Sequence, residues 1–395
     1  MPVLSFGATP LANAFLSPKQ LHEPELYFPL NVFLCERCGL VQLQDIVSPQ
    51  LLFSDYLYAS STSPVFRAHF EVFAESVTTR FHLKSSSLVV DIGSNDGILL
   101  APFQRLGIRV CGVDPAKTVA TLARKHGIPT EIAFFSHTYA KKLRKKLGGA
   151  DVITATNVFA HVDDIADIVK GVKHVLKPRG VFILEVPYLV DFLKQNIFDT
   201  VYHEHLSYFS VTALQYFFEL QGLEVIDVEK VDTHGGSIRV YVTRGSAKYA
   251  AQPSVKEFVE KEEKLSLKSP KVYAAYERRI QHNKLALLQL LFDLKRAGKS
   301  IAGYGAPAKG NTLLNVFGIG PELLDYIVDD SPLKQGKFSP GKRIPVVNSA
   351  HLERCPPDYI LIIAWNFASS IMKKNQAFHR AGGKFILPIP RPKVV

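Results

Sequence analysis

The segment TVYHEHLSYFS, residues 200–210, concentrates side chains that can do chemistry. His203 and His205 flank Glu204, and Tyr202 precedes them. Histidine changes its protonation near neutral pH and is the most common general base of enzymes. A metal site is the weaker interpretation, because two histidines spaced i, i+2 diverge on a helix and the H-E-x-x-H spacing is not present. Acid–base chemistry is therefore favoured, and a polar turn without chemistry remains the alternative.

A glycine-containing turn, VVDIGSNDGILL, lies between a predicted buried strand and a predicted helix. Glycines at such a turn let the backbone approach a ligand closely. The pattern D-x-G-x-x-x-G departs from the dinucleotide fingerprint, because Asp91 stands where the first glycine would be and would repel a pyrophosphate. A cationic cofactor without phosphate, S-adenosylmethionine, fits this turn better. A nicotinamide cofactor and a turn without any ligand remain alternatives.

Further polar residues stand at the ends of other predicted strands. Asp114 closes the strand RVCGVD, where an acid can accept hydrogen bonds from ribose hydroxyls. Asn157 and His161 follow the fourth predicted strand, at the carboxyl edge where parallel sheets bind ligands. The chain lacks at this place the D/N-P-P-Y/F run of base-modifying N-methyltransferases, which argues against base flipping. The candidate cofactor-binding residues are Asp91, Gly93, Asn95, Gly97, Asp114, Asn157 and His161.

A second glycine turn, GYGAPAKGNTLL, opens a predicted helix at residues 303–314. It is not a Walker P-loop, because Lys309 precedes the last glycine instead of following it. Gly305, the backbone amides and Lys309 suit an anion such as the diphosphate of a sugar nucleotide. The next predicted strand ends in Asp329, where an NAD-binding acid can lie. A nicotinamide-dependent nucleotide-sugar oxidoreductase is therefore the alternative function, and a purely structural turn is the other alternative.

The segment THGGSIRVY contains a pair of glycines and two cationic side chains. Gly235 and Gly236 allow close backbone approach beside His234. Arg239 on the following strand could reach a phosphate, but it could equally be an exposed strand residue. Both interpretations of Arg239 stay open.

Apolar strands alternate with helical periods along the central part of the chain, as in a parallel, doubly wound sheet. Two further strands near 223–232 and 236–245 predict an antiparallel end of this sheet. The chain is charged and helical after about residue 250, and the α/β alternation then restarts. We predict an α/β protein with a Rossmann-like domain, a second, smaller Rossmann-like domain and a loop-rich N-terminal segment. The predicted divisions are 1–60, 61–250, 251–298 for linker helices, and 299–395.

Composition narrows the class of protein. The chain has 395 residues, a formal net charge of +11 and four cysteines. A nucleic-acid scaffold would use this charge, but the basic run at 141–149 lacks interleaved aromatic residues and predicts a solvated helix face. No apolar run reaches the roughly 18 residues of a membrane helix, and no signal peptide is recognised. We expect a cytoplasmic monomer or homodimer that binds neither nucleic acid nor membrane.

Five motifs occur in the order found in a known family: CERCGLVQL, DIGSNDGILL, YHEHLSYFS, THGGSIRVY and GYGAPAKGNTLLN. From about Ser5 to about Pro390 the chain resembles the S-adenosylmethionine-dependent C-methyltransferases of nucleotide-linked deoxysugars. The resemblance implies a zinc-binding N-terminal segment, a central class I Rossmann-like methyltransferase domain and a C-terminal domain that helps to hold the nucleotide. It also implies methylation at C3 of a dTDP-4-keto-deoxysugar through an enolate.

The resemblance places the base that forms this enolate at His205. Glu204 and Tyr202 are its implied companions at the sugar oxygens. Tyr58 of the segment SDYLYASSTS is the better match to an N-terminal aromatic pair of the family and joins the catalytic group. The implied substrate-binding residues are Tyr56, His203, His234, Arg239, Gly305 and Lys309.

The zinc segment departs from the family pattern. The family uses two C-x-x-C pairs, and only the second, Cys35 and Cys38, is present, while the first would lie before Met1. Two cysteines alone cannot close a tetrahedral structural zinc site. Cys35 and Cys38 are therefore the candidate zinc ligands of this chain, but by themselves they do not support zinc as a cofactor.

Overall fold

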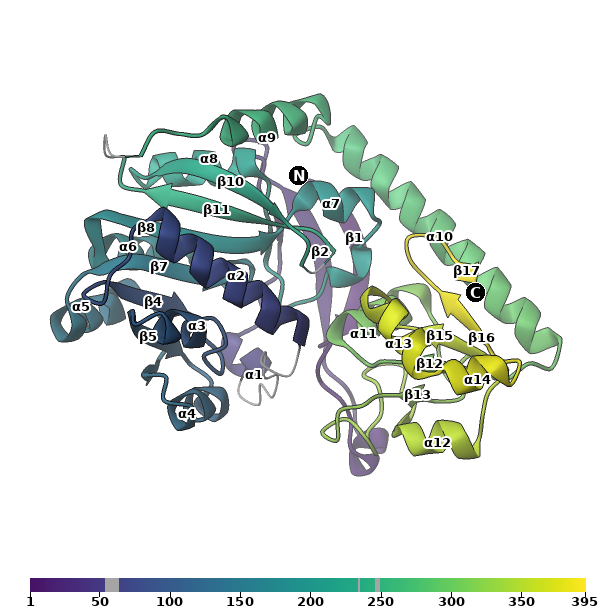
Figure 1. Ribbon diagram of the computed structural model, residues 1–395. Helices are drawn as coiled ribbons and strands as arrows, with labels where there is room; N and C mark the ends of the chain where they lie inside the picture. The colour runs from purple at the N-terminus through teal and green to yellow at the C-terminus, as the bar shows by residue number, and fades with distance from the viewer. Residues whose placement is uncertain (54–63, 234, 246–248) are drawn as a thin grey trace.

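A computed structural model describes the chain apart from residues 54–63, 234 and 246–248, and it contains three β-sheets (Figure 1). The four-stranded N-terminal sheet has the order β1-β2-β3-β9 and is antiparallel throughout. Its strands are β1 (Pro2–Pro10), β2 (Tyr27–Leu34), β3 (Val41–Leu43) and β9 (Ser207–Tyr208). The prediction of a loop-rich segment missed this sheet. β9 directly follows the Tyr-His-Glu-His turn, so the sheet ties the N-terminal segment to that turn.

The seven-stranded central sheet has the order β10-β11-β8-β7-β4-β5-β6. Its strands are β4 (Leu88–Ile92), β5 (Arg109–Asp114), β6 (Thr130–Ile132), β7 (Ala150–Thr156), β8 (Leu176–Pro187), β10 (Glu224–Val231) and β11 (Ser237–Thr243). In these described strands, β11 pairs antiparallel with both neighbours while the other pairs are parallel. β11 is thus inserted antiparallel between β10 and β8, and the predicted antiparallel end of the sheet is confirmed.

Helices cover both faces of the central sheet, as its buried strands require. Residues of α2 and α3 pack with Val89 and Val152 on one face, and residues of α5, α6 and α8 pack with Val90 and Ile153 on the other. The helices of this part are α1 (Pro49–Phe53), α2 (Pro64–Arg80), α3 (Leu100–Arg105), α4 (Lys117–Lys125), α5 (His137–Leu147), α6 (Ile165–Val175), α7 (Leu189–Lys194) and α8 (Val211–Leu220). The lysines at 141, 142 and 145 on α5 are exposed, as predicted.

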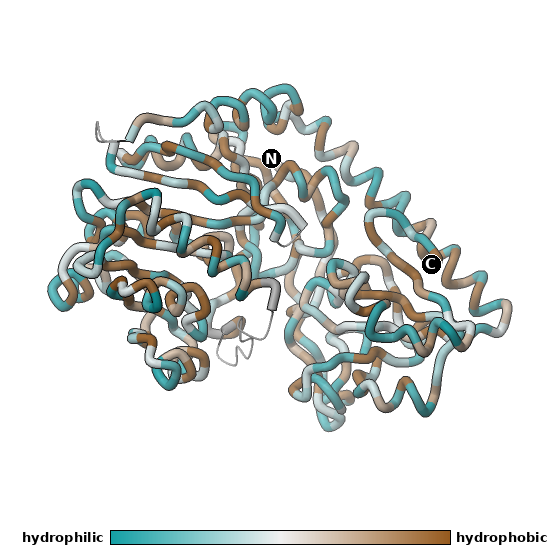
Figure 2. Tube along the Cα trace, in the orientation of Figure 1, coloured by the Kyte–Doolittle hydropathy of each residue, from teal (hydrophilic) through white to brown (hydrophobic). Residues whose placement is uncertain are grey.

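Two linking helices, α9 (Pro253–Lys264) and α10 (Pro270–Arg296), lead to the C-terminal domain. α10 runs along the outside of the molecule and carries long hydrophilic stretches, whereas the sheets are largely hydrophobic (Figure 2). α10 is hydrogen-bonded to both domains that it connects. Arg279 donates to the carbonyl oxygen of Leu193 in α7 at 2.5 Å, and Asn283 donates to the carbonyl oxygen of Pro388, which follows β16, at 3.0 Å. None of the helices in the described residues is long and apolar enough to cross a membrane.

The C-terminal sheet has the order β14-β13-β12-β15-β16-β17 and is parallel except for its last pair. Its strands are β12 (Ile301–Tyr304), β13 (Ile327–Val328), β14 (Val346–Val347), β15 (Tyr359–Ile362), β16 (Lys384–Leu387) and β17 (Lys393–Val394). Its helices are α11 (Ala308–Phe317), α12 (Ser349–Arg354), α13 (Ala368–Lys374) and α14 (Gln376–Arg380). This is the second, smaller α/β domain that the sequence predicts.

The three parts meet around the short 3-10 helix η4 (Phe198–Thr200). Phe198 stacks on Phe317 of α11 with ring centroids 4.7 Å apart, and it also contacts Phe6 of β1 at 6.2 Å. Residues from all three sheets belong to one continuous buried cluster. The Tyr-His-Glu-His turn begins two residues after η4, so it lies at this junction.

Candidate active site

His205 is held in one orientation by two hydrogen bonds. Its Nδ1 lies 2.7 Å from the carbonyl oxygen of Thr200, and its Nε2 lies 2.9 Å from the hydroxyl of Tyr202. Because a carbonyl only accepts, Nδ1 carries the hydrogen of the neutral ring, and the lone pair of Nε2 accepts from Tyr202. The His205 and Tyr202 side chains are half-buried. Nε2 is therefore the nitrogen that can take a proton.

His161 lies beside this pair. It belongs to the 3-10 helix η3 (Phe159–His161), which follows β7 at the carboxyl edge of the central sheet. Its ring meets that of His205 edge-on at 4.9 Å, and its Nδ1 lies 2.6 Å from the carbonyl oxygen of Glu204. Burial lowers the pKa of His161, which favours a neutral ring. The structure thus brings the predicted edge of the cofactor site and the predicted base together.

Glu204 is nearly buried, with 5% of its surface exposed. Burial raises the pKa of its carboxyl to about 7, and a hydrogen bond from Asn13 opposes this shift. The amide Nδ2 of Asn13 donates to Oε1 at 2.6 Å. A carboxyl with this pKa is partly protonated near neutral pH, so it can donate a hydrogen bond to a substrate oxygen.

His203 lies in different surroundings from His205. It is 1% exposed, and its Nε2 lies 3.2 Å from the carbonyl of Pro29 and 3.3 Å from that of Phe28, both on β2. These contacts hold the N-terminal sheet, and they give no support to the expectation that His203 binds substrate. No group of three or more histidine, cysteine or acidic side chains suited to a metal occurs among the described residues.

The turn between β4 and α3 has a tight backbone and buried acids. Gly93 has φ +68°, and a Cβ there would lie 2.2 Å from Cγ2 of Val158. Asp114 accepts from the amides of Asn95 and Ala116, each at 2.8 Å. The second predicted glycine, Gly97, has φ +82°. The local packing thus requires both glycines whether or not a ligand is bound.

Asp91 lies at the end of β4 and accepts from the hydroxyl of Thr154 at 2.6 Å. Burial raises its pKa to about 7. Among the described residues, Oδ1 of Asn157 is buried without a hydrogen-bond partner, on a residue with φ +56° after β7. An unsatisfied acceptor and two buried acids at the carboxyl edge fit a cofactor with amino and ribose hydroxyl groups better than one with a pyrophosphate.

Lys309 lies in the first turn of α11, at the junction of the domains. Its ammonium stands 4.0 Å from the ring centroid of Trp365, whose indole donates to Oδ2 of Asp199 at 2.6 Å. Burial lowers the pKa of Lys309, while the carboxylate of Asp199 opposes that shift. The Gly235 turn also lies here, because a Cβ on it would be 3.7 Å from Cη2 of Trp365. The structure thus brings two motifs that are distant in sequence together.

The second glycine turn is held by contacts among its own residues and their neighbours. Gly305 packs so closely on Ala364 that an added Cβ would lie 2.5 Å from the Cβ of Ala364. Asp329 accepts from the amide of Ala306 at 2.7 Å, and Lys334 donates to the carbonyl of Ala306 at 2.8 Å. Asp329 therefore helps to hold the turn itself.

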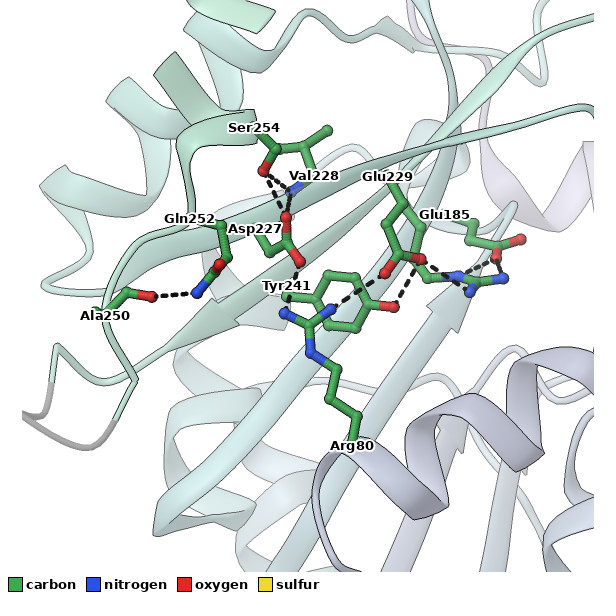
Figure 3. A network of polar contacts seen from close by, with 10 residues as sticks. Arg80, Glu185, Asp227, Val228, Glu229, Tyr241, Ala250, Gln252 and Ser254 are labelled. Atoms are coloured by element: carbon green, nitrogen blue, oxygen red, sulfur yellow. Dashed lines mark hydrogen bonds and ion pairs between the residues drawn. The ribbon is translucent and has the colours of Figure 1, made fainter. Parts of the chain in front are cut away.

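Arg239 belongs to a buried ion-pair network and is 6% exposed, so the interpretation as an exposed strand residue is wrong. Its guanidinium bonds to Glu185 at 2.6 Å and to Glu229 at 3.2 Å. Figure 3 shows how Arg80 of α2 continues this network to Glu229 and Asp227 on β10. The paired state of Arg239 does not support its predicted contact with a phosphate, because both of its carboxylate partners compete with that ligand.

Cys35 and Cys38 form the turn between β2 and β3. The amide of Gly39 donates to the carbonyl of Cys35 at 2.8 Å, and the amide of Leu40 lies 3.4 Å from the sulfur of Cys38. A hydrogen bond from the Cys38 amide lowers the pKa of Cys35, whereas burial raises that of Cys38. These two thiols do not by themselves fit a closed zinc site. The predictions for Tyr56, Tyr58 and His234 fall outside the described residues.

Asn13, Asp199 and Trp365 lie outside the sequence motifs, and Thr200 of the segment TVYHEHLSYFS has no predicted role. Asn13 donates to Glu204 through its side-chain amide, and Thr200 accepts from His205 through its backbone carbonyl. Neither contact produces a recognisable sequence pattern. Asp199 and Trp365 form the buried hydrogen bond between domains. Trp365 is the single tryptophan of the chain, and that alone could have drawn attention to it.

Comparison with known proteins identifies the family of the chain. Family models match residues 1–53 ("Putative zinc binding domain"), 66–228 ("Methyltransferase domain") and 232–390 ("C-methyltransferase C-terminal domain"). The C-methyltransferase NovU of Streptomyces niveus is 38% identical over 395 residues, covering 100% of this chain and 94% of that protein. The chain belongs to the C-methyltransferase family.

Other matches cover only part of the chain. The ubiquinone biosynthesis O-methyltransferase of Bartonella quintana (strain Toulouse) is 32% identical over 97 residues, which are 24% of this chain and 39% of that protein. A S-adenosylmethionine-dependent methyltransferase structure from Clostridium acetobutylicum ATCC 824 is 16% identical, with a TM-score of 0.38, and the match covers 50% of this chain and 96% of that one.

The predictions of a methyltransferase enzyme and of its α/β fold are confirmed by the family models and the sheet topology. S-adenosylmethionine is the cofactor of this class, as predicted. The oxidoreductase alternative finds no support in these comparisons.

Proposed function

We propose that this C-methyltransferase acts on a nucleotide-linked keto-deoxysugar, with C3 of a dTDP-4-keto-deoxysugar as the acceptor carbon. The observation that carries the proposal is the orientation of His205, whose Nδ1 is fixed on Thr200 while Nε2 faces Tyr202. A carbon nucleophile needs a base, because a C–H bond beside a ketone must lose its proton first. A neutral amine acceptor attacks with its own lone pair and needs no base before the methyl transfer.

The chain's own residues suit the steps of enolate formation. When the hydroxyl of Tyr202 turns from Nε2 of His205 to the sugar, the freed lone pair of Nε2 takes the proton from the carbon beside the ketone. Glu204, in its protonated form, donates a hydrogen bond to the ketone oxygen as negative charge develops there. Tyr202 binds a neighbouring sugar oxygen. S-adenosylmethionine, when bound, supplies an electrophilic methyl group.

The cofactor and the nucleotide are assigned to the two glycine turns. Asp91, Asn95, Asp114 and Asn157, at the carboxyl edge of the central sheet, would hold S-adenosylmethionine. Lys309 of α11 would attract the diphosphate, supported by its position at the junction between the domains. The proposed partner is thus a small nucleotide-sugar, with no nucleic acid or membrane and with a monomer or homodimer as the working unit.

The proposal is tested with purified protein, S-adenosylmethionine and a dTDP-4-keto-deoxysugar. Mass spectrometry should show the gain of one methyl group, and deuterium from the solvent should enter the carbon beside the ketone even without the methyl donor. The variant His205→Ala should lose both reactions while it still binds S-adenosylhomocysteine. Near-normal turnover of this variant would contradict the assignment of the base. Methylation of an oxygen in the wild type would contradict the enolate.

A further inference from the structure

The turn that follows β1 reaches Glu204 across 191 residues of sequence. The side-chain amide nitrogen Nδ2 of Asn13 donates to Oε1 of Glu204 at 2.6 Å. Asn13 itself is exposed, whereas Glu204 is 5% exposed. The position of this carboxyl therefore depends on a side chain from the N-terminal segment, which the sequence motifs do not include.

The same turn is held from its other side by the C-terminal domain. Asn311 of α11 is 1% exposed and donates to the carbonyl of Ala12 at 2.7 Å. Asn315, one helical turn later, donates to the carbonyl of Asn311 at 2.8 Å. Ala12 and Asn13 are consecutive, so one short turn connects α11 with Glu204.

The other groups around Glu204 do not replace this hydrogen bond. His161 contacts the backbone carbonyl of Glu204. The charge of the Asp45 carboxylate interacts with the neighbouring His203 and not with Glu204. His205 follows Glu204 in the chain, and its two ring nitrogens face Thr200 and Tyr202. No ion pair of Glu204 is found within the described part of the chain.

We propose that Asn13 is a positioning residue for Glu204 and that Asn311 holds Asn13 in place from the C-terminal domain. An amide N–H can only donate, so Oε1 must accept in both protonation states of Glu204. The proton of the neutral acid is then confined to Oε2, which is the oxygen left to donate to the sugar. This inference rests on the proposed function of Glu204 and adds the device that selects its donating oxygen.

The variant Asn13→Ala tests the inference in the full-length enzyme. We expect kcat to fall about tenfold with a small change in KM for the sugar, because a hydrogen bond to an ionisable group is lost while the binding surface remains. The loss of activity at high pH should also move to higher pH, since Asn13 favours the ionised form of Glu204. This pH shift should disappear when Asn13→Ala is made in a Glu204→Gln background.

A matched control is available in the same sheet. The hydroxyl of Ser5 donates to Oδ1 of Asn31 at 2.7 Å, between β1 and β2. Asn31→Ala removes an amide hydrogen bond of the N-terminal sheet without touching Glu204. It should leave the pH profile unchanged, and a profile shifted as far as in Asn13→Ala would overturn the proposal.

A second readout is independent of the substrate. The pKa of Glu204 in the folded state is raised to about 7. The contribution of Glu204 to the free energy of unfolding is therefore fully present below its unfolded pKa, and it is lost as the pH rises through about 7. Asn13→Ala should extend this loss to higher pH in thermal unfolding. Unchanged pH dependence in both unfolding and rate would refute the inference. A shift in unfolding without methylation of any nucleotide keto-sugar by the wild type would refute the proposed function alone.

Discussion

Three histidines lie near the carboxyl edge of the central sheet, and their hydrogen bonds distinguish their roles. His203 is fixed on two carbonyls of β2, and His161 is fixed on the carbonyl of Glu204. Only His205 of these three has one nitrogen fixed on a carbonyl and the other facing the hydroxyl of Tyr202. In the sequence, His203 and His205 share one motif and His161 lies apart from it. Only the family resemblance assigned the base to His205, because the residue types of the motif do not show which way the turn directs each ring.

Asp91 offers a prediction at the scale of one residue. Burial raises its pKa to about 7, so its contribution to stability is present below the unfolded pKa and is lost as pH rises through about 7. Asp91→Asn removes the titrating group and keeps the shape that accepts from Thr154. We expect this variant to lose less stability than the wild type between about pH 5 and about pH 8 in thermal unfolding.

The matched control is Glu131→Gln, on β6, which removes a half-buried carboxylate whose pKa is lowered by a hydrogen bond from Lys146. This variant should not reduce the pH dependence of the stability in the same pH interval. The same pH dependence in Asp91→Asn and wild type would show that Asp91 does not titrate there.

At the scale of elements, the glycine turn after β4 depends on packing as well as on a ligand. Gly93 has φ +68°, and its added Cβ would meet Val158, whereas Gly107 has φ +78° with nothing within 4 Å of such a Cβ. Both alanine variants incur the backbone strain of a positive φ, about 1 kcal/mol or more. Gly93→Ala should lower the free energy of unfolding by a further 1–3 kcal/mol or so, because Val158 must move. Denaturant unfolding compares the two, and equal losses would contradict the packing argument.

The same scale shows what sequence reveals and what it does not. The long buried strands β4, β5, β7 and β8 were predicted because each is a nearly continuous apolar run. β9 has two residues and β3 has three, so their pairing comes from tertiary contacts and not from local preference. The pairing of β3 with β9 brings the turn of Glu204 to the N-terminal sheet, so the contact between Glu204 and Asn13 could not be predicted from the sequence. The acid–base motif could be predicted from sequence because it combines two histidines, a glutamate and a tyrosine. The role of Thr200 could not be predicted, because it acts through its backbone carbonyl, which every residue has.

At the scale of the whole molecule, three separate parts of the chain meet at one junction. Lys309 and Trp365 come from the C-terminal domain, Asp199 comes from η4, and Asn13 comes from the N-terminal turn. Burial raises the pKa of Asp199, and Lys309 with the Trp365 indole favours its ionised form. Asp199 immediately precedes Thr200, whose carbonyl orients His205. The domain that is proposed to hold the nucleotide is thus linked to the proposed base by a short series of contacts.

This junction predicts an optical signal. Trp365 is the only tryptophan of the sequence, and the ammonium of Lys309 lies 4.0 Å from its ring centroid. If Lys309 moves to the diphosphate of a nucleotide, the cation leaves the ring and the tryptophan emission changes. Titration with dTDP should therefore give a saturable change in fluorescence. The variant Lys309→Met keeps most of the side-chain volume without the charge, so it should reduce both the affinity for dTDP and the change itself.

The control for this signal is Lys299→Met, just before β12. Its ammonium is exposed and pairs with Asp358 at 3.1 Å, at the amino end of β12, whereas the glycine turn follows the carboxyl end of that strand. We expect its dTDP titration to match that of the wild type. A wild-type emission that does not respond to dTDP, although calorimetry shows dTDP to be bound, would place the nucleotide away from Trp365. In that case Lys309 would serve to compensate the buried charge of Asp199 and not to bind the substrate.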